Sequence, residues 1–562
     1  MIRNEVNMEK PIKNILFIIP PFFPTHDLAA KEHTSQQPVF TIPYGVLSLA
    51  AYIKEYSRFD VRMQVMDLNL AAFQLSCASR GIEEGLRQLI REKMQNFCPD
   101  IVGISALFNT CYDHLELISI EVNAVDENAL LIIGGGLGTN LYREILNNFS
   151  LIDACCYGEG EIPFCQLVDA DDHHQQICSH PSWVTRESLQ TGRVPQHTFV
   201  QDLDNIPFFD YELIDLNNYT GRSLDKSYSQ KSLREISIHT SRGCPFNCVF
   251  CSNATIHGKK IRFMSVEKVI AEIELAVKRY SVKVLLIEDD HFLSDKQRAK
   301  MILERTREFN LKIEFPNGIA VYAIDEEVGE LLRKAGVTTI SLAVESGSDF
   351  MLHEIINKPL KVSMIKPAVE ILKKNGISVH AFIVIGIPGE LETHRDETMR
   401  MLYDVGFDWI KFFLAIPVAG SRLYDICKEK GYLVDTNFSH YVTTKANIRT
   451  PDIDPEYIED KVYMMNLEAN FIYNYNMRIM NFRKAVITFE NIVQRYPEHA
   501  FAHYCLAKNY EGLGWNTQLV QHHLNRALEI ISTDAIWARY AQHFGLFPEK
   551  FAGGEGVRGQ NC

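Results

Sequence analysis

The chain is predicted to be an α/β protein in three parts: an N-terminal doubly wound, Rossmann-like parallel sheet, a central partial (β/α)6 barrel and a C-terminal α-helical region. Three observations predict this fold class. Short apolar runs alternate with helix-length amphipathic segments, which is typical of parallel sheets covered by helices. Three closely spaced cysteines follow the first apolar run of the second half of this alternating region. Beyond residue 455 the pattern is helical only.

Size, charge and cysteine usage limit the class of protein. With 562 residues the chain can hold two to four domains, and its net charge of −14 argues against a general binder of nucleic acid or anionic membranes. No apolar stretch approaches the ~20 residues of a membrane span. The N-terminus carries charges and Pro11 where a signal peptide needs an apolar run. The 13 cysteines do not form a disulfide framework, so we expect a cytoplasmic protein. Because of the negative net charge, we expect no nucleic-acid partner.

The first domain, residues 1–170, is predicted to begin with a buried strand at residues 15–19. The expected later elements are a helix at 45–54, a strand at 61–66, a helix at 83–97, a strand at 101–105, a helix at 113–125 and strands at 130–133 and 152–156. The alternation predicts a doubly wound parallel sheet.

Ligands of such sheets bind beyond the carboxyl ends of the strands. The residues at or just after these ends are Pro20, Pro21, Asp67, Ser105, Gly134, Gly135, Gly136, Gly158, Glu159 and Gly160. Glycines there let the backbone approach a ligand closely, although tight turns are the alternative explanation for each one. The G-x-G-x-x-G fingerprint is absent after the first strand, so NAD or FAD is not expected.

Residues 171–234 are polar and show little periodicity, and they are predicted to form an irregular connector. His173 and His174 could bind a metal, but a solvated loop is the expected setting for this pair.

The central domain, residues 235–447, opens with an apolar run at 235–240 and a loop with the spacing Cys244-x3-Cys248-x2-Cys251. Three thiolates within eight residues can converge on one metal centre, but they are one short of the four that close a structural zinc or iron–sulfur site. They can therefore hold a [4Fe–4S] cluster and leave the fourth iron open to a ligand. Zinc is the alternative metal.

The rest of this domain continues the alternation of strands and helices. Ser265 is the expected N-cap of a helix that begins at Val266, and Ser294 is the expected capping-box start of the next helix. Further strands are expected at 284–287, 313–316, 339–344, 379–385 and 409–414, with helices at 325–335 and 362–375. In a barrel the functional groups lie at the carboxyl ends of the strands. Acidic residues and glycines recur there, at 289–290, 345–347 and 386–390.

The C-terminal region, residues 448–562, is predicted to be helical. Apolar stripes at 485–493, 502–510 and 519–531 recur at close to the ~34-residue period of tetratricopeptide repeats. Fewer repeats are visible than the roughly three that a free-standing array needs. We therefore expect these tetratricopeptide-like helices to pack on the barrel, either as a structural cap or as a surface for a protein partner.

The central domain resembles the radical SAM superfamily, through the cysteine spacing and through the strand ends at 342–348 and 385–390. The resemblance implies a [4Fe–4S] cluster on the three cysteines, with S-adenosylmethionine (SAM) on the open iron. One-electron cleavage of SAM would then give a 5′-deoxyadenosyl radical that abstracts hydrogen from an unactivated carbon. An electron donor such as flavodoxin or ferredoxin is implied as a partner. The SAM contacts implied are Phe250, Glu345, Ser346, Gly386 and Pro388.

Residues 12–170 resemble the cobalamin-binding domain that precedes the catalytic domain in one large class of radical SAM enzymes. The matching pieces are the proline pair, residues 43–50, the Asp67 strand end, and the glycine-rich segments 134–136 and 158–161. The resemblance implies cobalamin contacts at the ten strand-end residues named above. The D-x-H-x-x-G motif is missing, so no histidine is expected to ligate cobalt through it.

The leading functional hypothesis is a cobalamin-dependent radical SAM methyltransferase. It would methylate an unactivated carbon, or phosphorus, of a small-molecule or peptide substrate in a biosynthetic pathway. One alternative keeps both cofactors but performs cyclisation or oxidative rearrangement without methyl transfer. Others are a radical SAM enzyme whose first domain no longer binds cobalamin, and a non-enzymatic metal-binding scaffold. The sequence does not identify the substrate.

Overall fold

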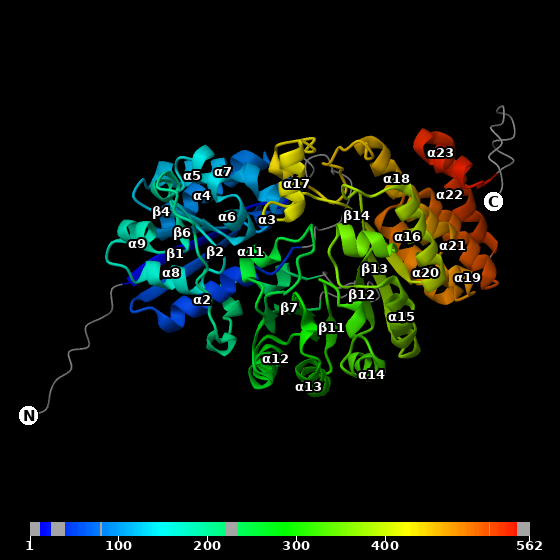
Figure 1. Cartoon of the computed structure of the whole chain (residues 1–562), viewed down its shortest axis with the longest axis horizontal. Helices are drawn as coiled ribbons and strands as arrows, with labels where there is room; N and C mark the ends of the chain where they lie inside the picture. The colour runs from blue at the N-terminus through cyan, green and yellow to red at the C-terminus, as the bar shows by residue number, and fades with distance from the viewer. Residues whose placement is uncertain (1–11, 24–39, 79–80, 221–232, 516, 548–562) are drawn as a thin grey trace, which may run out of the picture.

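The computed structural model describes residues 12–23, 40–78, 81–220, 233–515 and 517–547. The N-terminal sheet, the partial barrel and the helical region follow one another along the long axis (Figure 1). This arrangement confirms the predicted fold class. The two ends of the chain and residues 221–232 of the predicted connector lie outside the described residues. No helix in the described ranges is both long and apolar enough to cross a membrane.

The N-terminal sheet has six strands in the order β2-β1-β3-β4-β5-β6, and all pairs are parallel except β5 with β6. This strand order crosses over at β1, as a doubly wound sheet requires. The strands are β1 (Ile12–Ile19), β2 (Asp60–Asp67), β3 (Ile101–Ser105), β4 (Leu130–Gly134), β5 (Ala154–Cys156) and β6 (Trp183–Val184), and the helices are α2 (Tyr44–Tyr56), α3 (Leu68–Cys77), α4 (Ile82–Phe97), α5 (Leu115–Val125), α6 (Gly135–Asn140), α7 (Tyr142–Asn148) and α8 (Glu161–Val168).

Strand β1 shows why this sheet needs helices on both faces. Leu16 and Ile18 pack into one apolar cluster with α4 and α5, whereas Ile15 and Phe17 pack into a second cluster with α2 and α8. Successive side chains of a strand point to opposite faces, so an uninterrupted apolar run must be covered twice. The prediction of a buried parallel strand at 15–19 is confirmed.

The segment from 171 to 220 is more regular than the predicted irregular connector. The Asp172 side chain accepts a hydrogen bond from the Gln175 N–H at 2.9 Å and caps α9 (His173–Ser179), so His173 and His174 begin a helix rather than lie in a loop. Strand β6 extends the sheet, and its Trp183 is fully buried. A two-residue strand has no periodicity, so the pattern of the sequence did not predict it.

The barrel consists of two three-stranded parallel sheets, ordered β11-β10-β7 and β12-β13-β14, which an isolated parallel bridge between Ile319 and Leu342 connects. The strands therefore follow the chain order of a partial six-stranded barrel. The elements are β7 (Glu235–Ile238), β8 (Ser241–Arg242), α11 (Asn253–His257), β9 (Arg262–Phe263), α12 (Val266–Tyr280), β10 (Val284–Ile287), α13 (Lys296–Thr306), β11 (Lys312–Glu314), α14 (Glu326–Lys334), β12 (Thr339–Glu345), α15 (Ile365–Lys374), β13 (Ser378–Ile385), α16 (Glu392–Val405), β14 (Trp409–Leu414) and α17 (Arg422–Lys430).

The two predicted helix caps have different outcomes. Ser265 caps α12 as predicted, because its hydroxyl accepts from the Lys268 N–H at 3.1 Å. The prediction for Ser294 is wrong by one residue, since the Asp295 carboxylate accepts from the Arg298 N–H at 3.0 Å and caps α13. Aspartate and serine are comparable N-caps, so neighbouring candidates are not separated by type alone.

After the barrel the chain returns to the N-terminal part. Phe438 packs into the same apolar cluster as α4 and α5, and its ring lies 5.2 Å from that of Tyr112. The Asp113 N–H donates to the Ser439 hydroxyl at 3.2 Å. This segment ties the first domain to the end of the barrel.

The C-terminal helices pack against the outer edge of β14. They are α18 (Pro455–Leu467), α19 (Tyr475–Arg478), α20 (Phe482–Arg495), α21 (Ala500–Gly512), α22 (Thr517–Thr533) and α23 (Ala535–His543). The Asn470 side chain accepts from the Ile410 N–H at 2.8 Å and donates to the Ile410 carbonyl at 2.7 Å, which pairs the backbone of this edge strand. The helical prediction is confirmed, and the tetratricopeptide-like repeat stays a prediction.

Candidate functional site

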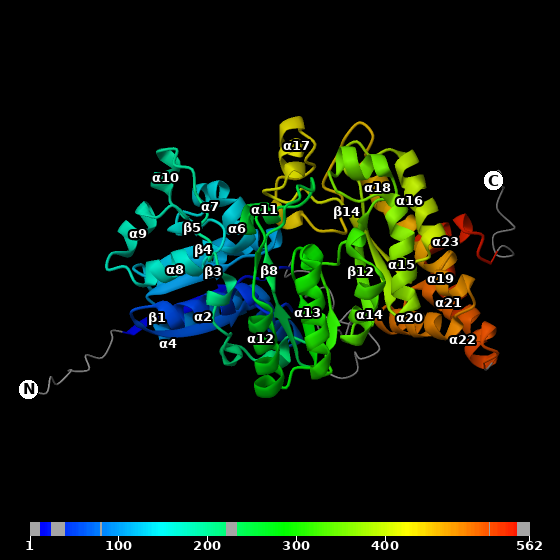
Figure 2. The ribbon, with the colours of Figure 1, turned by 60° about the horizontal axis from the view of Figure 1, so that its bottom comes forward.

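A cavity of about 760 Å³ lies between the carboxyl end of the N-terminal sheet and the mouth of the barrel. Helix α11 of the barrel lies against α6 of the N-terminal part at this junction (Figure 2). Both domains therefore contribute walls to one site, as their strand-end arrangement predicts.

Most of the predicted site residues line this cavity. They are Pro20, Ser105, Gly134, Gly135, Gly136, Gly158, Glu159, Gly160, Cys244, Cys248, Phe250, Cys251 and Glu345. Five others are not among its lining residues in the part of the chain that the structure describes, and these are Pro21, Asp67, Ser346, Gly386 and Pro388. The roles of all of them in binding a cofactor stay predictions.

Local hydrogen bonds account for three of the residues outside the cavity wall. The Asp67 carboxylate caps α3 and accepts from the Tyr219 hydroxyl at 2.8 Å, and Asn69 lines the cavity in its place. The Ser346 hydroxyl accepts from the Ser348 N–H at 3.2 Å. The Gly386 N–H donates to the Glu390 carboxylate at 2.7 Å, so this strand end is closed by its own loop.

The turn after β4 requires glycine on the sheet side of the cavity. Gly135 has φ = +86°, and a Cβ atom there would lie 2.6 Å from the Ala106 carbonyl oxygen. The backbones that follow β3 and β4 are therefore in direct contact. Leu107 and Phe108 line the cavity next to this turn with 58% and 42% of their surface exposed. Uncovered apolar side chains inside a concave site are typical of a surface that binds an apolar ligand.

The cysteine loop enters the cavity from the barrel. Cys244 and Cys248 are half-buried and Cys251 is exposed. The loop is fixed at its centre, because the Val249 N–H donates to the Ile356 carbonyl at 2.8 Å and the Cys251 N–H donates to the Cys248 carbonyl at 3.0 Å.

A buried carboxylate holds the base of this loop. Asp289 accepts from the Thr240 N–H, the Thr240 hydroxyl and the Ser241 hydroxyl, each at 2.6 Å. Burial raises the pKa of Asp289 to about 6, against the opposing effect of these hydrogen bonds. The Arg298 guanidinium donates to the Thr240 carbonyl at 2.7 Å. Asp289 therefore positions the loop, whereas the neighbouring Asp290 lines the cavity.

Loss of solvent around the sulfur atoms raises the pKa of Cys244 and Cys248, and that of Cys251 to about 11, although Cys251 as a whole residue is exposed. A metal binds the thiolate, so metal binding here must release protons. Among the described residues, no three His, Cys, Asp or Glu side chains are grouped closely enough to hold a single metal ion. In a cubane cluster each cysteine binds a different iron, so a three-cysteine set surrounds the cluster rather than a single ion.

An ion pair faces the cysteines across the barrel mouth. The Lys358 ammonium lies 3.0 Å from the Glu345 carboxylate, and both residues line the cavity. Burial lowers the pKa of Lys358, but Glu345 and the sulfur atoms of Cys248 and Cys244 outweigh it and hold the pKa above its ordinary value. Glu345 has φ = +67° at a bulge in β12, a conformation that is rare for residues other than glycine and occurs at functional sites.

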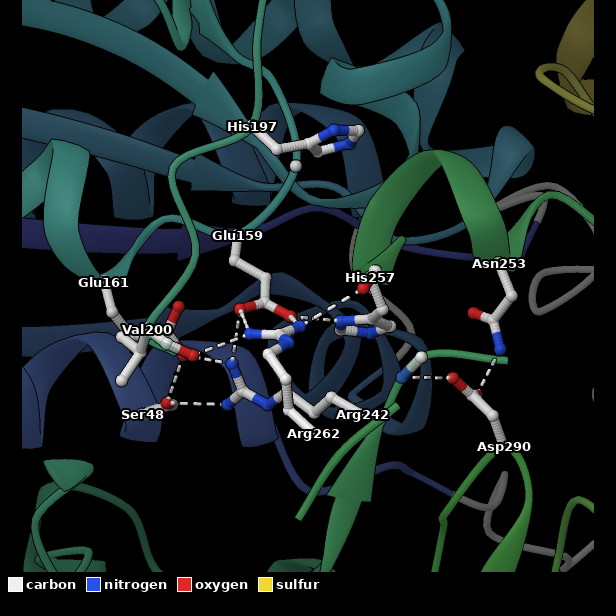
Figure 3. A network of polar contacts seen from close by, with 12 residues as sticks. Ser48, Glu159, Glu161, His197, Val200, Arg242, Asn253, His257, Arg262 and Asp290 are labelled. Atoms are coloured by element: carbon white, nitrogen blue, oxygen red, sulfur yellow. Dashed lines mark hydrogen bonds and ion pairs between the residues drawn. The ribbon is translucent and has the colours of Figure 1, made fainter. Parts of the chain in front are cut away.

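The sequence did not predict a buried ion-pair network between the two domains. The Glu159 carboxylate of the N-terminal part points at the side chains of Arg242, Arg262 and His257 of the barrel (Figure 3). The two arginines and Glu159 are buried. Glu159 was predicted from its motif, but its partners lie up to 103 residues away, and no local pattern indicates the pairing.

The arrangement fits the groups that the sequence predicts. The cavity offers soft thiol ligands on one wall, a glycine-lined turn with uncovered apolar side chains on the opposite wall, and a buried ion pair beside the thiols. Thiolates are the ligands of iron–sulfur clusters. The glycine-lined strand ends lie where doubly wound sheets bind their ligands.

Comparisons with known proteins agree with the geometry. Residues 238–402 match the radical SAM superfamily and residues 38–168 match the B12 binding domain. An uncharacterized methyltransferase of Pyrococcus horikoshii is 30% identical over 354 residues, which cover 63% of this chain and 75% of that protein. The cytidylyl-2-hydroxyethylphosphonate methyltransferase of Streptomyces wedmorensis is 26% identical over 473 residues, which cover 78% and 87%.

The fold matches a solved structure along nearly the whole chain. The cobalamin-dependent S-adenosylmethionine radical enzyme OxsB, with aqua-cobalamin and S-adenosylmethionine bound, superposes with a TM-score of 0.61 at 11% identity, covering 97% of this chain and 82% of that one. The predicted cofactors, a [4Fe–4S] cluster, SAM and cobalamin, are confirmed by the two matched domains. The chain belongs to the radical SAM superfamily, within the class of enzymes whose radical SAM domain follows a B12-binding domain.

Proposed function

We propose that this enzyme is a cobalamin-dependent radical SAM methyltransferase that methylates an unactivated carbon, or phosphorus, of a small-molecule or peptide substrate. One observation carries the proposal: the strand ends of the B12-binding domain and the cysteine loop open onto the same cavity. When bound, the cluster and SAM would supply a 5′-deoxyadenosyl radical, and cobalamin would supply the methyl group.

The chain's own residues would bind the cofactors, orient them and exclude water from the site. Cys244, Cys248 and Cys251 would hold the cluster, and the Glu345–Lys358 pair beside them offers both a carboxylate and an ammonium to the amino and carboxylate groups of SAM. The glycine-lined turn and the apolar side chains on the opposite wall would hold cobalamin. A cavity enclosed by two domains limits access of water to reactive species.

The reductant, the compartment and the C-terminal partner belong to the same proposal. A flavodoxin or ferredoxin would reduce the cluster, and the cytoplasm would supply such a donor. Every cysteine in the described ranges is free, as a reducing compartment favours. A protein partner at the C-terminal helices, and their repeat character, rest on the sequence pattern alone.

The test is anaerobic turnover of the reconstituted enzyme with SAM carrying a deuterated methyl group, a chemical reductant and candidate substrates. We expect a deuterated methyl group in the product, with S-adenosylhomocysteine and 5′-deoxyadenosine as coproducts. 5′-Deoxyadenosine without S-adenosylhomocysteine would favour the alternative reaction without methyl transfer. Failure of the purified protein to bind added cobalamin would contradict both.

A further inference from the structure

The buried ion-pair network connects the two walls of the cavity. From the B12-binding side, Glu159 and Glu161 lie 3.3 Å and 2.8 Å from the Arg242 guanidinium. Ser48 of α2 closes the group, because its hydroxyl donates to Glu161 at 2.6 Å and accepts from Arg242 at 3.2 Å. All four side chains are buried (Figure 3).

A second arginine holds Glu159 from the other side. The Arg262 guanidinium donates to both carboxylate oxygens, at 2.9 Å and 2.5 Å, and to the Val200 carbonyl at 2.8 Å. It lies 4.3 Å from the centre of the Phe199 ring. His257 contributes a further contact to Glu159 at 2.8 Å. Two carboxylates and two guanidiniums thus balance in charge, and these arginines hold the pKa of Glu159 well below its usual range despite burial.

Short stretches of backbone connect the ion-pair network to both walls of the cavity. Glu159 lies between Gly158 and Gly160, which line the cavity on the predicted cobalamin side. Arg242 directly precedes Gly243 and Cys244. Gly243 has φ = +100°, and a Cβ atom there would lie 2.6 Å from the Lys260 carbonyl oxygen, so the step from Arg242 to the first cysteine is tightly constrained.

Stability alone is a weak reason for such a network. Taking charges out of water costs free energy that their attraction often only offsets, and apolar residues of similar size can replace buried ion pairs without loss. What charged groups add is a defined geometry, since bidentate arginine–carboxylate pairs tolerate little displacement. This geometry is set where two cofactor walls must face each other.

We propose that Arg242, paired with Glu159 and Glu161, is a positioning residue that fixes the cluster loop against the cobalamin-binding wall and so sets the separation of the two cofactors. The proposal rests on the proposed function for its consequence in turnover. Its structural content concerns the chain itself and is testable in the protein without cofactors.

The first test is thiol alkylation of the cofactor-free protein, followed by mass spectrometry at each cysteine. In Glu159→Gln we expect Cys244 and Cys248 to react roughly threefold faster or more with N-ethylmaleimide, because the loop opens locally more often. The matched control is Glu121→Gln. Glu121 is also a buried carboxylate held by two arginines, Arg87 and Arg91, but it lies on α5 away from the cavity.

The second test uses the enzyme with its cofactors bound and a measurement that would not change if the network only stabilised the fold. The magnetic interaction between Co(II) and the reduced cluster, measured by electron paramagnetic resonance on samples matched in iron and cobalamin content, should weaken or broaden in Glu159→Gln. The ratio of 5′-deoxyadenosine to methylated product should rise about tenfold, since small misplacements of reacting groups cost rates of this order. Glu121→Gln should change neither quantity.

A conservative variant covers the case in which Glu159→Gln does not fold. Glu159→Asp keeps the charge but shortens the side chain by one methylene, and it should give intermediate alkylation rates and an intermediate product ratio. Unchanged alkylation and unchanged magnetic interaction in both folded variants would overturn the proposal. If the wild-type enzyme transfers no methyl group, the proposed function fails, but the alkylation rates still decide the positioning role.

Discussion

The barrel is bounded by two interfaces that are built from different chemistry. Its contact with the B12-binding domain contains the buried charges of Glu159, Glu161, Arg242 and Arg262, and it encloses a large cavity. Its contact with the C-terminal helices centres on a neutral amide, Asn470, which pairs the backbone of β14.

The second interface also contains a large apolar cluster. Phe471 and Phe489 are fully buried within the helical region, and Trp409 of β14 packs against the same cluster. Its charged contacts include Lys461 with Glu392, and Lys484 with the buried Asp408 at 2.7 Å. Apolar packing and a paired edge are sufficient to attach one element to another. The comparison teaches that four buried charges connect the barrel to the domain with which it encloses the cavity, whereas an amide that pairs the backbone, apolar packing and separate ion pairs attach the C-terminal helices.

Removal of the cysteines should show the difference between the cavity side and the rest of the protein most clearly. In Cys244→Ala, Cys248→Ala and Cys251→Ala we expect complete loss of cluster absorption and of SAM cleavage, because three ligands are needed for a site-open cluster. The thermal midpoint of the cofactor-free protein should be nearly unchanged, since these side chains are not deeply buried. Iron analysis and visible absorption measure the first effect and calorimetry the second.

The exposed Cys77, at the end of α3, provides the control. Cys77→Ala should leave iron content and activity intact. Normal iron binding in a variant that combines all three substitutions would contradict the cluster assignment.

Gly135→Ala should damage the cavity side through backbone geometry. Alanine at a positive φ costs about 1–2 kcal/mol, and the contact with the Ala106 carbonyl adds a backbone shift, for a total of about 3 kcal/mol. We expect weaker cobalamin binding in an equilibrium titration, together with a lower urea midpoint.

Gly192 separates the two contributions. It also has a positive φ, of +71°, but a Cβ atom there would have no heavy atom within 4 Å. Gly192→Ala should therefore lose only the conformational part and bind cobalamin normally. Equal losses in the two variants would show that close approach at Gly135 is unimportant.

Asn470→Ala tests the interface with the C-terminal helices. The change leaves the Ile410 N–H and carbonyl buried without a partner, and we expect the free energy of unfolding to fall by about 2 kcal/mol. Turnover at a temperature where the protein is folded should be unaffected, in contrast to the cavity-side variants. Urea denaturation measures the loss, and Asn525→Ala on the exposed face of α22 is the control. Impaired turnover would mean that the C-terminal helices act on the site.

At both interfaces the sequence predicted the local features and missed the long-range pairing. The cysteine loop and the glycine-rich strand ends were predicted because their chemistry is local: a spacing or a conformational need is visible within a few residues. The apolar stripes of α20 and α21 were predicted for the same reason, as Phe489 and Leu506 recur on buried faces.

Long-range pairing left no such signal. Nothing near Glu159 indicates Arg262, and nothing near Asn470 indicates that it pairs the backbone of an edge strand 60 residues earlier. Gly386 was predicted to contact SAM, and that role stays a prediction; its N–H donates to Glu390 within the same loop, a contact that the motif did not indicate. Which strand ends face the cavity depends on the curvature of the barrel and the docking of the first domain.

The smallest expected effect is a pH dependence of stability that arises from a histidine pair within the C-terminal helices. His503 Nε2 lies 2.9 Å from the Pro497 carbonyl, which only accepts, so this nitrogen carries the proton. His503 Nδ1 then accepts from His523 Nδ1, 2.8 Å away. Burial, with His503 and His522 nearby, lowers the pKa of His523 to about 4.

The folded state therefore keeps His523 neutral where the unfolded chain is protonated. Its contribution to stability is present above the ordinary histidine pKa of about 6.5 and is lost as the pH falls from there toward 4. Urea denaturation at pH 7.5 and pH 5 should show a lower midpoint at pH 5, and His523→Gln should reduce that difference. The exposed His543 on α23 is the control, and His543→Gln should leave the difference unchanged. An equal pH response in His523→Gln and wild type would place the titrating groups elsewhere in the protein.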